Sequence, residues 1–371
     1  MSLLPAATDV FIIGGGPAGL AAAIAARQRG FAVTVADCSV PPIDKACGEG
    51  IMPDGLAAAA ALGLDLRQAG GYPFRGIRFR EGDVSVGAAF PQGSGLGLRR
   101  TALHSYMVER AAAAGVQMAW GARITGLRDG AVIADGRTVR ARWTVGADGG
   151  RSLVRRWAGL DGCERDSRRY GFRRHYRVAP WSEHMELHWA DAGQLYLTPV
   201  SASEVCAVLI SRDPRLRLDE ALPLFPEAAR RLAGAAPAGN ERGAVSASRR
   251  LDSVCRGRVA LVGDASGSVD AITGEGLCLL FQQALALARA MESGDLSFYE
   301  AEHRRIGKRP ELMANLMLLL DGRKRLRRRA IRAMAARPRL FARMLAMHVG
   351  EISPLSFASN GLALGWRILT T

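Results

Sequence analysis

The sequence predicts an α/β protein that has a βαβ domain, a β-rich insertion within that domain and a helical C-terminal region. An apolar run over 9–13, a glycine turn, an alanine-rich stretch and a β-branched alternation over 31–35 follow the order strand, turn, helix, strand. Residues 170–212 have the pattern of strands, whereas residues 300–349 are mostly helical in pattern. A βαβ unit together with a separate block of strands is typical of an α/β domain that an insertion interrupts.

Periodicity and turn residues predict the remaining elements in chain order. Residues 75–90 are expected to form a hairpin that turns at its Glu-Gly-Asp sequence, and residues 101–114 a helix. Three short runs within 122–145, separated by Asp-Gly turns, predict a β-meander. A buried strand at 259–262 and a helix over 276–291 are expected to complete the first domain.

This reading divides the chain into a discontinuous first domain, an inserted sheet domain and a C-terminal helical region. The expected bounds are 1–70, 95–165 and 250–300 for the first, 71–94 and 166–249 for the insertion, and 301–371 for the helices. A chain of 371 residues exceeds what one undivided core usually accommodates. Six scattered cysteines without a C-x-x-C pair argue against a disulfide scaffold or a zinc ribbon. With no leader pattern and no run of about 18–20 apolar residues, a cytoplasmic protein is expected.

The positive charge of the chain is concentrated near its C-terminus. Residues 304–343 hold 14 basic and two acidic residues, a net of +12, so that the rest of the chain carries only +3 of the total of +15. An evenly basic protein would indicate a nucleic-acid partner, whereas this chain has a nearly neutral body with a basic end. Nucleic-acid binding is therefore not expected.

A glycine motif between the first strand and the first helix predicts a dinucleotide site. Gly14 permits the tight turn, Gly16 lets the backbone approach a pyrophosphate, and Gly19 lets the helix pack closely on the sheet. Phosphates would lie on the free N–H groups at the start of that helix. Asp37 ends the second strand, where a carboxylate can accept ribose hydroxyls and repel a 2′-phosphate. The tightly held nucleotide is therefore expected to be FAD or NAD, but not NADP.

Two later segments favour FAD. A strand ends in Gly146-Ala147-Asp148-Gly149, and another ends in Gly263-Asp264. The second is followed by Thr273-Gly274-Glu275-Gly276 at a helix start. A carboxylate at a strand end can bond a ribityl hydroxyl, and backbone N–H groups at a glycine-rich helix start can bond a flavin carbonyl.

In this order, the motifs resemble those of the FAD-dependent monooxygenases of the para-hydroxybenzoate hydroxylase type and of the related geranylgeranyl reductases and flavin-dependent halogenases. The resemblance covers roughly residues 5–300. It implies a Rossmann-like FAD-binding domain of the glutathione-reductase type with an inserted β-sheet substrate domain. It also implies that the following residues bind FAD: Gly14, Gly16, Pro17, Ala18, Gly19, Asp37, Lys45, Cys47, Gly48, Arg100, Asp148, Gly149, Gly263, Asp264, Gly274, Glu275 and Gly276.

The branch of this superfamily is less sharply indicated. The W-x-W-x-I-P sequence of the halogenases is absent, which argues against halogenation. The Cys47-Gly48 segment and Thr273–Gly276 look most like the reductases, whereas Tyr196-Leu197-Thr198-Pro199 looks more like the monooxygenases. The leading expectation is a monooxygenase that hydroxylates or epoxidises an apolar or aromatic biosynthetic intermediate through a flavin C4a-hydroperoxide. A reductase of prenyl double bonds is the alternative, and a flavoprotein that serves as a binding module is the alternative from another class.

The sequence contains one dinucleotide-binding motif, so a second, permanently bound nucleotide is not expected. NAD(P)H is therefore expected to bind transiently as the reductant, or a separate reductase supplies the electrons.

Candidate pocket residues come from the loop after the second strand and from the inserted sheet. Alternation over 183–189 places His184, Glu186 and His188 on one strand face, which lines the pocket or lies in solvent. A metal site there is disfavoured because alternate strand positions spread ligands over about 13 Å. The candidates are Cys47, His184, Glu186, His188, Tyr196 and Pro199. The basic run Arg173-Arg174-His175 suits an anionic group of the substrate or a solvated face.

The basic C-terminal region has apolar residues at helical spacing, with breaks near Gly322 and Pro338. Helices packed on the body with a solvated basic face are one interpretation. A second interpretation is that 304–343 contacts an anionic membrane peripherally or forms an apolar entrance for the substrate. A third is that this region binds an acidic carrier protein that delivers the substrate.

Overall fold

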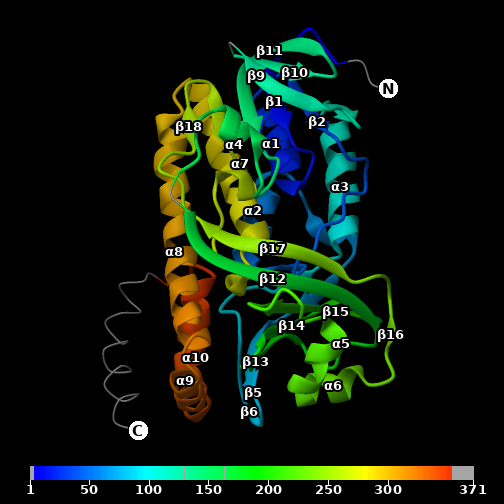
Figure 1. Cartoon of the computed structure of the whole chain (residues 1–371), viewed down its shortest axis with the longest axis vertical. Helices are drawn as coiled ribbons and strands as arrows, with labels where there is room; N and C mark the ends of the chain where they lie inside the picture. The colour runs from blue at the N-terminus through cyan, green and yellow to red at the C-terminus, as the bar shows by residue number, and fades with distance from the viewer. Residues whose placement is uncertain (1–3, 129, 163, 353–371) are drawn as a thin grey trace.

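Two large β-sheets, joined by a small third sheet and by helices, form the protein (Figure 1). The computed structural model describes residues 4–128, 130–162 and 164–352. The predicted α/β class, with a βαβ domain, an inserted sheet and C-terminal helices, is confirmed. The expected domain boundaries stay a prediction.

The first sheet contains the βαβ unit. Its strands are β1 (Ala7–Ile13), β2 (Val33–Asp37), β8 (Gln117–Trp120), β9 (Ile124–Arg128), β10 (Ala131–Ala134), β11 (Arg137–Gly146), β18 (Cys255–Arg256) and β19 (Val259–Leu261). The order is β18-β19-β11-β1-β2-β8, and β9 and β10 continue from β11 as the predicted meander. Strands β19, β11, β1, β2 and β8 run parallel. Val10, Phe11 and Ile12 are fully buried because both faces of this parallel sheet are covered.

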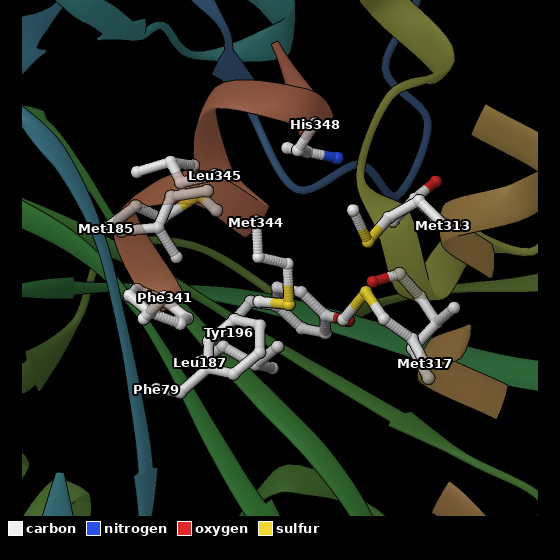
Figure 2. Close-up of a pocket in the computed structure, with 13 residues that line it drawn as sticks. Phe79, Met185, Leu187, Tyr196, Met313, Met317, Phe341, Met344, Leu345 and His348 are labelled. Atoms are coloured by element: carbon white, nitrogen blue, oxygen red, sulfur yellow. The ribbon is translucent and has the colours of Figure 1, made fainter. Parts of the chain in front are cut away.

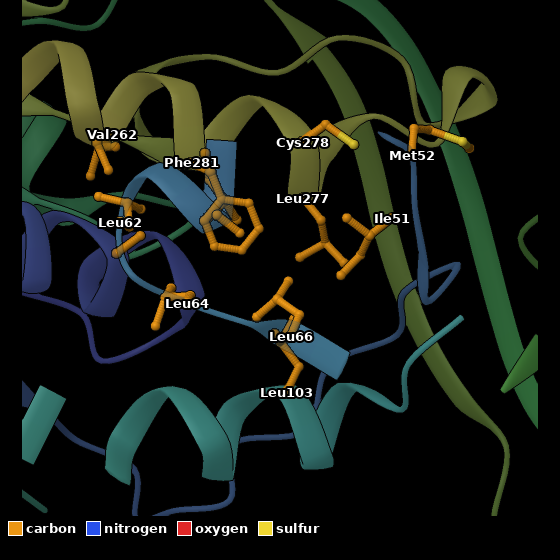
Figure 3. Packing of buried hydrophobic residues seen from close by; sticks show 14 of the residues in the cluster. Ile51, Met52, Leu62, Leu64, Leu66, Leu103, Val262, Leu277, Cys278 and Phe281 are labelled. Atoms are coloured by element: carbon orange, nitrogen blue, oxygen red, sulfur yellow. The ribbon is translucent and has the colours of Figure 1, made fainter. Parts of the chain in front are cut away.

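Helices α1 (Pro17–Gln28), α3 (Arg100–Ala113) and α7 (Gly276–Ser293) pack together beside the first sheet. The alanines of α1 allow close packing against α7. Figure 3 shows Phe281 and Leu277 of α7 facing Leu62, Leu64 and Leu66, with Leu103 of α3 on the other side. Helix α4 (Leu153–Trp157) packs near β9 instead.

The second sheet is antiparallel except where β13 pairs with β5. Its strands are β5 (Gly76–Glu81), β6 (Val84–Ala89), β12 (Glu164–Arg177), β13 (His184–Ala190), β14 (Gly193–Ser201), β15 (Glu204–Ser211), β16 (Ala236–Pro237) and β17 (Arg242–Arg249). The order is β16-β12-β15-β14-β13-β5-β6, with β17 also paired to β12. Strands β5 and β6 are the predicted hairpin. One face is covered by α5 (Leu218–Ala221), η2 (Leu222–Leu224) and α6 (Pro226–Leu232), and the other faces the helices of the body.

A three-stranded sheet, which the sequence did not predict, links the two large ones. It consists of β3 (Gly50–Ile51), β7 (Gly95–Gly97) and β4 (Tyr72–Phe74), with α2 (Pro53–Ala61) and η1 (Leu66–Ala69) between β3 and β4 in the chain. It lies so close to β14 that a Cβ on Gly97 would be 1.8 Å from the carbonyl oxygen of Pro199. Glycine is therefore needed at position 97 for the sheets to meet. Strands this short show no usable periodicity.

The C-terminal region forms α8 (Ser297–Asp321), α9 (Lys324–Ala336) and α10 (Pro338–His348), with the predicted breaks near Gly322 and Pro338. Helix α8 runs the length of the molecule, and α9 and α10 pack against β5 and β6 (Figure 1). Arg327 of α9 is buried and bonds Glu81 at 2.9 Å and Asp191 at 2.8 Å, which ties α9 to the second sheet. Within the described ranges, no helix has both the length and the apolar character needed to cross a membrane.

Candidate functional site

The glycines of the first motif divide into packed and open positions. Gly14 has φ +112° and a Cβ there would lie 2.3 Å from the Ala147 carbonyl oxygen, while a Cβ on Gly19 would lie 1.8 Å from the Gly14 carbonyl oxygen. Gly16 is different, because its Cβ would meet no described atom nearer than Arg100 Nη2 at 3.9 Å. Gly16 also precedes Pro17 as the N-cap of α1, with no side-chain cap. The first N–H groups of α1 therefore lie beside an open space that suits a pyrophosphate.

Asp37 lies at the end of β2 and holds this loop in place. Its carboxylate accepts hydrogen bonds from the backbone N–H groups of Gly15 and Ser39, each at 2.7 Å. On the other side of the loop, buried His104 of α3 lies 2.9 Å through Nε2 from the Gly15 carbonyl oxygen. The sequence reasoning missed His104, since no local pattern connects it with the glycine loop.

Arg100 is positioned to neutralise a phosphate. It begins α3, and its Nε is buried with no hydrogen-bond partner in the described part of the chain. Near it, Lys45 Nζ lies 2.8 Å from Asp264 Oδ2, and both side chains are half exposed. Desolvation acts to raise the pKa of Asp264, but Lys45 and Arg100 outweigh it, so the pKa lies below its ordinary value. Asp264 is thus a carboxylate that can accept from a ligand hydroxyl.

The later motifs have different roles in the structure. A Cβ on Gly48, Gly274 or Gly276 would meet no described atom within 4 Å, so these positions adjoin open space. Asp148 instead has its carboxylate engaged by α4, because Oδ2 accepts from the backbone N–H of Leu153 at 2.7 Å. Asp148 therefore caps a helix. Pro17 and Ala18 are the first residues of α1, Gly149 lies between β11 and α4, and Gly263 begins η3 (Gly263–Ser266).

The open glycines, the unpartnered Arg100 and the Lys45–Asp264 pair fit an extended dinucleotide. The donor set, a helix N-terminus with nearby cations, suits the phosphates of FAD.

Glu49, in the loop before β3, joins the cofactor loop to the second sheet. It has φ +59° and is completely buried. Its Oε1 accepts from Arg173 Nη1 at 2.6 Å and from the Arg100 backbone N–H at 3.0 Å, and its Oε2 lies 2.6 Å from His175 Nε2. Burial acts to raise the pKa of Glu49, but His175, with Arg100 and Arg173, holds it below its ordinary value. Arg173 and His175 therefore brace the loop, whereas Arg174 faces the other way and pairs with Asp219.

Glu49, His175 and Cys206 also place three possible metal-ligand atoms within 4.8 Å of one another. Both oxygens of Glu49 are already hydrogen-bonded, and Arg173 contributes a positive charge beside them. Burial raises the pKa of the Cys206 thiol well above its ordinary value, which disfavours the thiolate that a metal needs. The arrangement fits a hydrogen-bonded network better than a metal site. Cys47 is likewise a thiol, since burial raises its pKa.

A narrow cavity lies between the second sheet and the C-terminal helices (Figure 2). Its lining comes from β5, β13, β14, η4 (Ala271–Thr273), α8 and α10 and is almost wholly apolar. The lining residues are Ile77, Phe79, Met185, Leu187, Tyr196, Ile272, Thr273, Met313, Met317, Phe341, Met344, Leu345 and His348. Because η4 leads directly into Gly274 and the start of α7, the cavity adjoins the segment expected at the flavin ring.

The predicted pocket face of β13 is not the one that lines this cavity. Met185 and Leu187 line it, so that His184, Glu186 and His188, at the alternate positions, point to the opposite face. Glu186 and His188 are buried there and lie 2.9 Å apart, so that face is not in solvent either. Pro199 is also outside the cavity.

Tyr196 is the one of the six pocket candidates that lines the cavity. Its hydroxyl donates to the Ile272 carbonyl oxygen at 2.6 Å.

Sequence reasoning also missed a polar cluster at the edge of the cavity. Glu275 Oε2 lies 3.7 Å from His348 Nδ1, and Glu275 Oε1 lies 3.7 Å from Arg309 Nη2. Arg309 Nη2 also lies 2.5 Å from Asp54 Oδ2. These four side chains come from α2, the start of α7, α8 and α10. No local pattern could have joined positions so far apart in the chain.

Fold and site together define a flavoprotein of the Rossmann type with an apolar cavity. The chain belongs to the FAD binding domain family, whose model matches residues 7–293. It is 30% identical over 320 residues to a protein named menaquinone reductase of Mycobacterium tuberculosis, covering 78% of each chain. It is 34% identical over 172 residues to 6-methylpretetramide 4-monooxygenase of Streptomyces rimosus, covering 41% of each. A flavoprotein/dehydrogenase from Cytophaga hutchinsonii has a similar fold, with a TM-score of 0.80, 18% identity and coverage of 92% and 93%.

The family and its relatives establish that the chain is an FAD-dependent oxidoreductase. The predicted resemblance to the para-hydroxybenzoate hydroxylase superfamily is confirmed.

Proposed function

We propose that this enzyme is an FAD-dependent reductase that saturates a carbon–carbon double bond in a prenyl-type substrate, with the polyprenyl tail of a quinone as the substrate class. The observation that carries the proposal is the apolar cavity beside the start of α7. The likeness to a menaquinone reductase, over 78% of both chains, supports the quinone class. This choice favours the reductase branch over the monooxygenase that the sequence put first.

The chain supplies the groups that hold FAD, and reduced FAD supplies a hydride. The N–H groups at the start of α1 and the guanidinium of Arg100 would neutralise the pyrophosphate. Asp264, held ionised by Lys45, would accept from a ribityl hydroxyl. The Glu49 network fixes the intervening loop, so that these groups keep their positions without reorganisation.

The cavity binds and desolvates the reacting part of the substrate. Four of its lining residues are methionines, whose flexible, polarizable side chains adapt to an irregular hydrocarbon chain. Phe79 and Phe341 pack edge to face at 4.9 Å between ring centroids and close one end. Apolar walls exclude water from the double bond, so that a hydride is not lost to solvent.

A transient NAD(P)H or a separate reductase protein is proposed as the electron source. The chain contains one G-x-G-x-x-G motif at a strand-to-helix turn, and that motif is assigned to FAD.

A monooxygenase is the second candidate, since relatives that match 41% of the chain are named monooxygenases. The two candidates are separated by mass spectrometry of the product. FAD-loaded enzyme is reduced with dithionite without oxygen, mixed with a short-chain menaquinone, and compared with a sample in air. The expected result is a product, formed without oxygen, that is still heavier by two hydrogen atoms after its quinol head has been reoxidised to the quinone in air. A product heavier by one oxygen atom, formed only in air, would instead establish the monooxygenase.

A further inference from the structure

The polar cluster at the edge of the cavity contains one of its lining residues, His348, beside a buried carboxyl group. His348 is the last residue of α10, and Glu275 precedes the first residue of α7. Figure 2 shows His348 at the end of the cavity away from Phe79 and Leu187. Both side chains are more than nine-tenths buried. The pair therefore connects the flavin-side segment with the substrate space.

Three polar atoms of the cluster are buried without a hydrogen-bond partner among the residues that the structure describes. They are Glu275 Oε2, His348 Nδ1 and Arg309 Nε. A buried polar atom left without a partner costs about 1–3 kcal/mol, so such atoms are rare unless they serve a function. Glu49 provides the contrast, because both of its buried oxygens are bonded. The Glu275 cluster can therefore change its hydrogen-bond partners, whereas the fully bonded Glu49 network stays fixed.

Both members of the pair are neutral near pH 7. Burial, with a smaller contribution from Asp54, raises the pKa of Glu275 to about 8 even though Arg309 opposes it. Burial, with help from Arg309, lowers the pKa of His348 to about 4. A protonated carboxyl group can donate a hydrogen bond, and a neutral imidazole can accept at one nitrogen and donate at the other. Cys278, also packed here, stays a thiol because burial raises its pKa well above the ordinary value.

We propose that His348 is the proton donor of the reduction and that Glu275 resupplies its proton, an inference that rests on the proposed reductase function. One carbon of the double bond receives the hydride that reduced FAD supplies, and the other receives the Nε2 proton of His348. The π bond breaks and two C–H bonds form. Nδ1 takes the proton of the Glu275 carboxyl group, whose negative charge is then stabilised by Arg309. A proton from solvent then binds at Nε2 and Nδ1 returns its proton to Glu275, which restores both groups.

The packing around the pair is specialised for this exchange. At 3.7 Å, Glu275 Oε2 and His348 Nδ1 are slightly beyond hydrogen-bond distance, and catalytic contacts commonly shorten when the substrate binds. Gly350, after α10, has φ +82°, and a Cβ there would be 1.9 Å from Arg309 Nη1. The turn therefore leaves room for Arg309 to reach Glu275. Asp54 holds the same guanidinium from α2.

The test compares H348Q and E275Q with a control that has the same chemistry elsewhere. E186Q is the control, because Glu186 also pairs with a buried histidine but lies on the far face of the second sheet. Alkene reduction under anaerobic single turnover is measured from pH 5 to 10 with menaquinone of short chain length. General acid catalysis contributes roughly 10²–10⁴-fold, so kcat of H348Q and E275Q is expected to fall about 100-fold or more, while KM and FAD binding change little. E186Q keeps the wild-type kcat per folded, FAD-bound molecule.

Two further readouts distinguish proton supply from a structural role. Wild-type kcat should decrease above about pH 8 as Glu275 ionises, and this limb should be absent in E275Q. Infrared difference spectra of the FAD-bound enzyme should show the carbonyl stretch of a protonated carboxyl group that E275Q removes and E186Q retains.

Unchanged kcat in both variants, or an ionised Glu275 at pH 7 in the infrared spectra, would overturn the inference. Failure of the proposed function gives a different result. Wild-type enzyme would then reduce no double bond at any pH, which also removes the donor role, while the carboxyl band would still report the protonation of Glu275.

Discussion

Replacing Glu275 with glutamine should change how the stability of the protein depends on pH. The side chain is 2% exposed, and its pKa rises from an ordinary value of 4.5 to about 8 in the folded protein. Folding therefore favours the protonated carboxyl group. Glutamine has nearly the same shape but never ionises, and Arg309 keeps its contact with Asp54. The substitution removes one ionisation and little packing.

The sign and size of the effect follow from the two pKa values. Below pH 4.5 the carboxyl group is protonated in both folded and unfolded chains, so wild type and E275Q differ little. As pH rises from 4.5 to 8 the unfolded chain loses the proton and the folded chain keeps it, so wild-type stability falls by about 1.4 kcal/mol per pH unit relative to E275Q. Over about 3.5 pH units the difference reaches about 5 kcal/mol. His348, whose pKa is lowered to about 4, acts in the opposite range, because its contribution to stability is lost as pH falls from 6.5 towards 4.

Urea unfolding of the two FAD-saturated proteins at pH 5, 6, 7 and 8 measures this difference. Taking the difference between them cancels the contribution of His348 and of all other groups that the substitution leaves alone. We expect E275Q to gain steadily on wild type as pH rises. A difference that stays constant across this range would show that Glu275 is ionised in the folded protein, and the reasoning about its burial would be wrong.

Three other predictions concern the core, the cofactor loop and the basic helices. Arg169 is 2% exposed and bonds Asp270 and Asp321, so R169M should lower the free energy of unfolding by about 3–5 kcal/mol in urea. A fall below 1 kcal/mol would contradict this estimate. G16A should weaken FAD binding about tenfold or more in fluorescence titrations, because the added Cβ enters the open space beside α1. The Tm of the apoprotein should not change, since this Cβ does not enter the core. Equal affinity would show that the pyrophosphate binds elsewhere. We propose that the exposed arginines of α9 contact anionic membranes. The combined substitutions R325Q, R328Q and R329Q should therefore abolish sedimentation with anionic vesicles at low salt. Unchanged sedimentation would show that these arginines form only a solvated face.

The sequence predicted those features of the fold and the site that a short stretch of chain determines by itself. Gly14, Gly16 and Gly19 lie within one turn of the chain, so a local motif suffices to find them, although the closest contact of Gly14 is with Ala147. For β13, alternation correctly placed Glu186 and His188 on one face. It could not show which face adjoins the cavity, because that depends on the position of α8 and α10 in the folded protein. A polar face is buried here because its charges pair with one another and with Arg78.

The cluster around Glu275 could not be predicted from the sequence at all. Asp54 and His348 are nearly 300 positions apart, and only the packing of α2, α8 and α10 brings them to the Arg309–Glu275 pair, Asp54 to Arg309 and His348 to Glu275. The residue type alone indicated nothing, because a lone histidine near a chain end has many ordinary roles. Its meaning comes from burial beside an unpartnered carboxyl oxygen.

The helices of the basic C-terminal region have two faces with different roles. Apart from buried Arg327, the charge of α9 and α10 is on their outer faces. The inner faces of α8 and α10 supply Met313, Met317, Phe341, Met344, Leu345 and His348 to the cavity. The family match ends at residue 293, before all of these residues. The matched region therefore holds the flavin, whereas nearly half of the cavity lining comes from helices beyond it. We therefore expect substrate choice in this protein to change with substitutions in α8 and α10 and not with substitutions in the glycine loop.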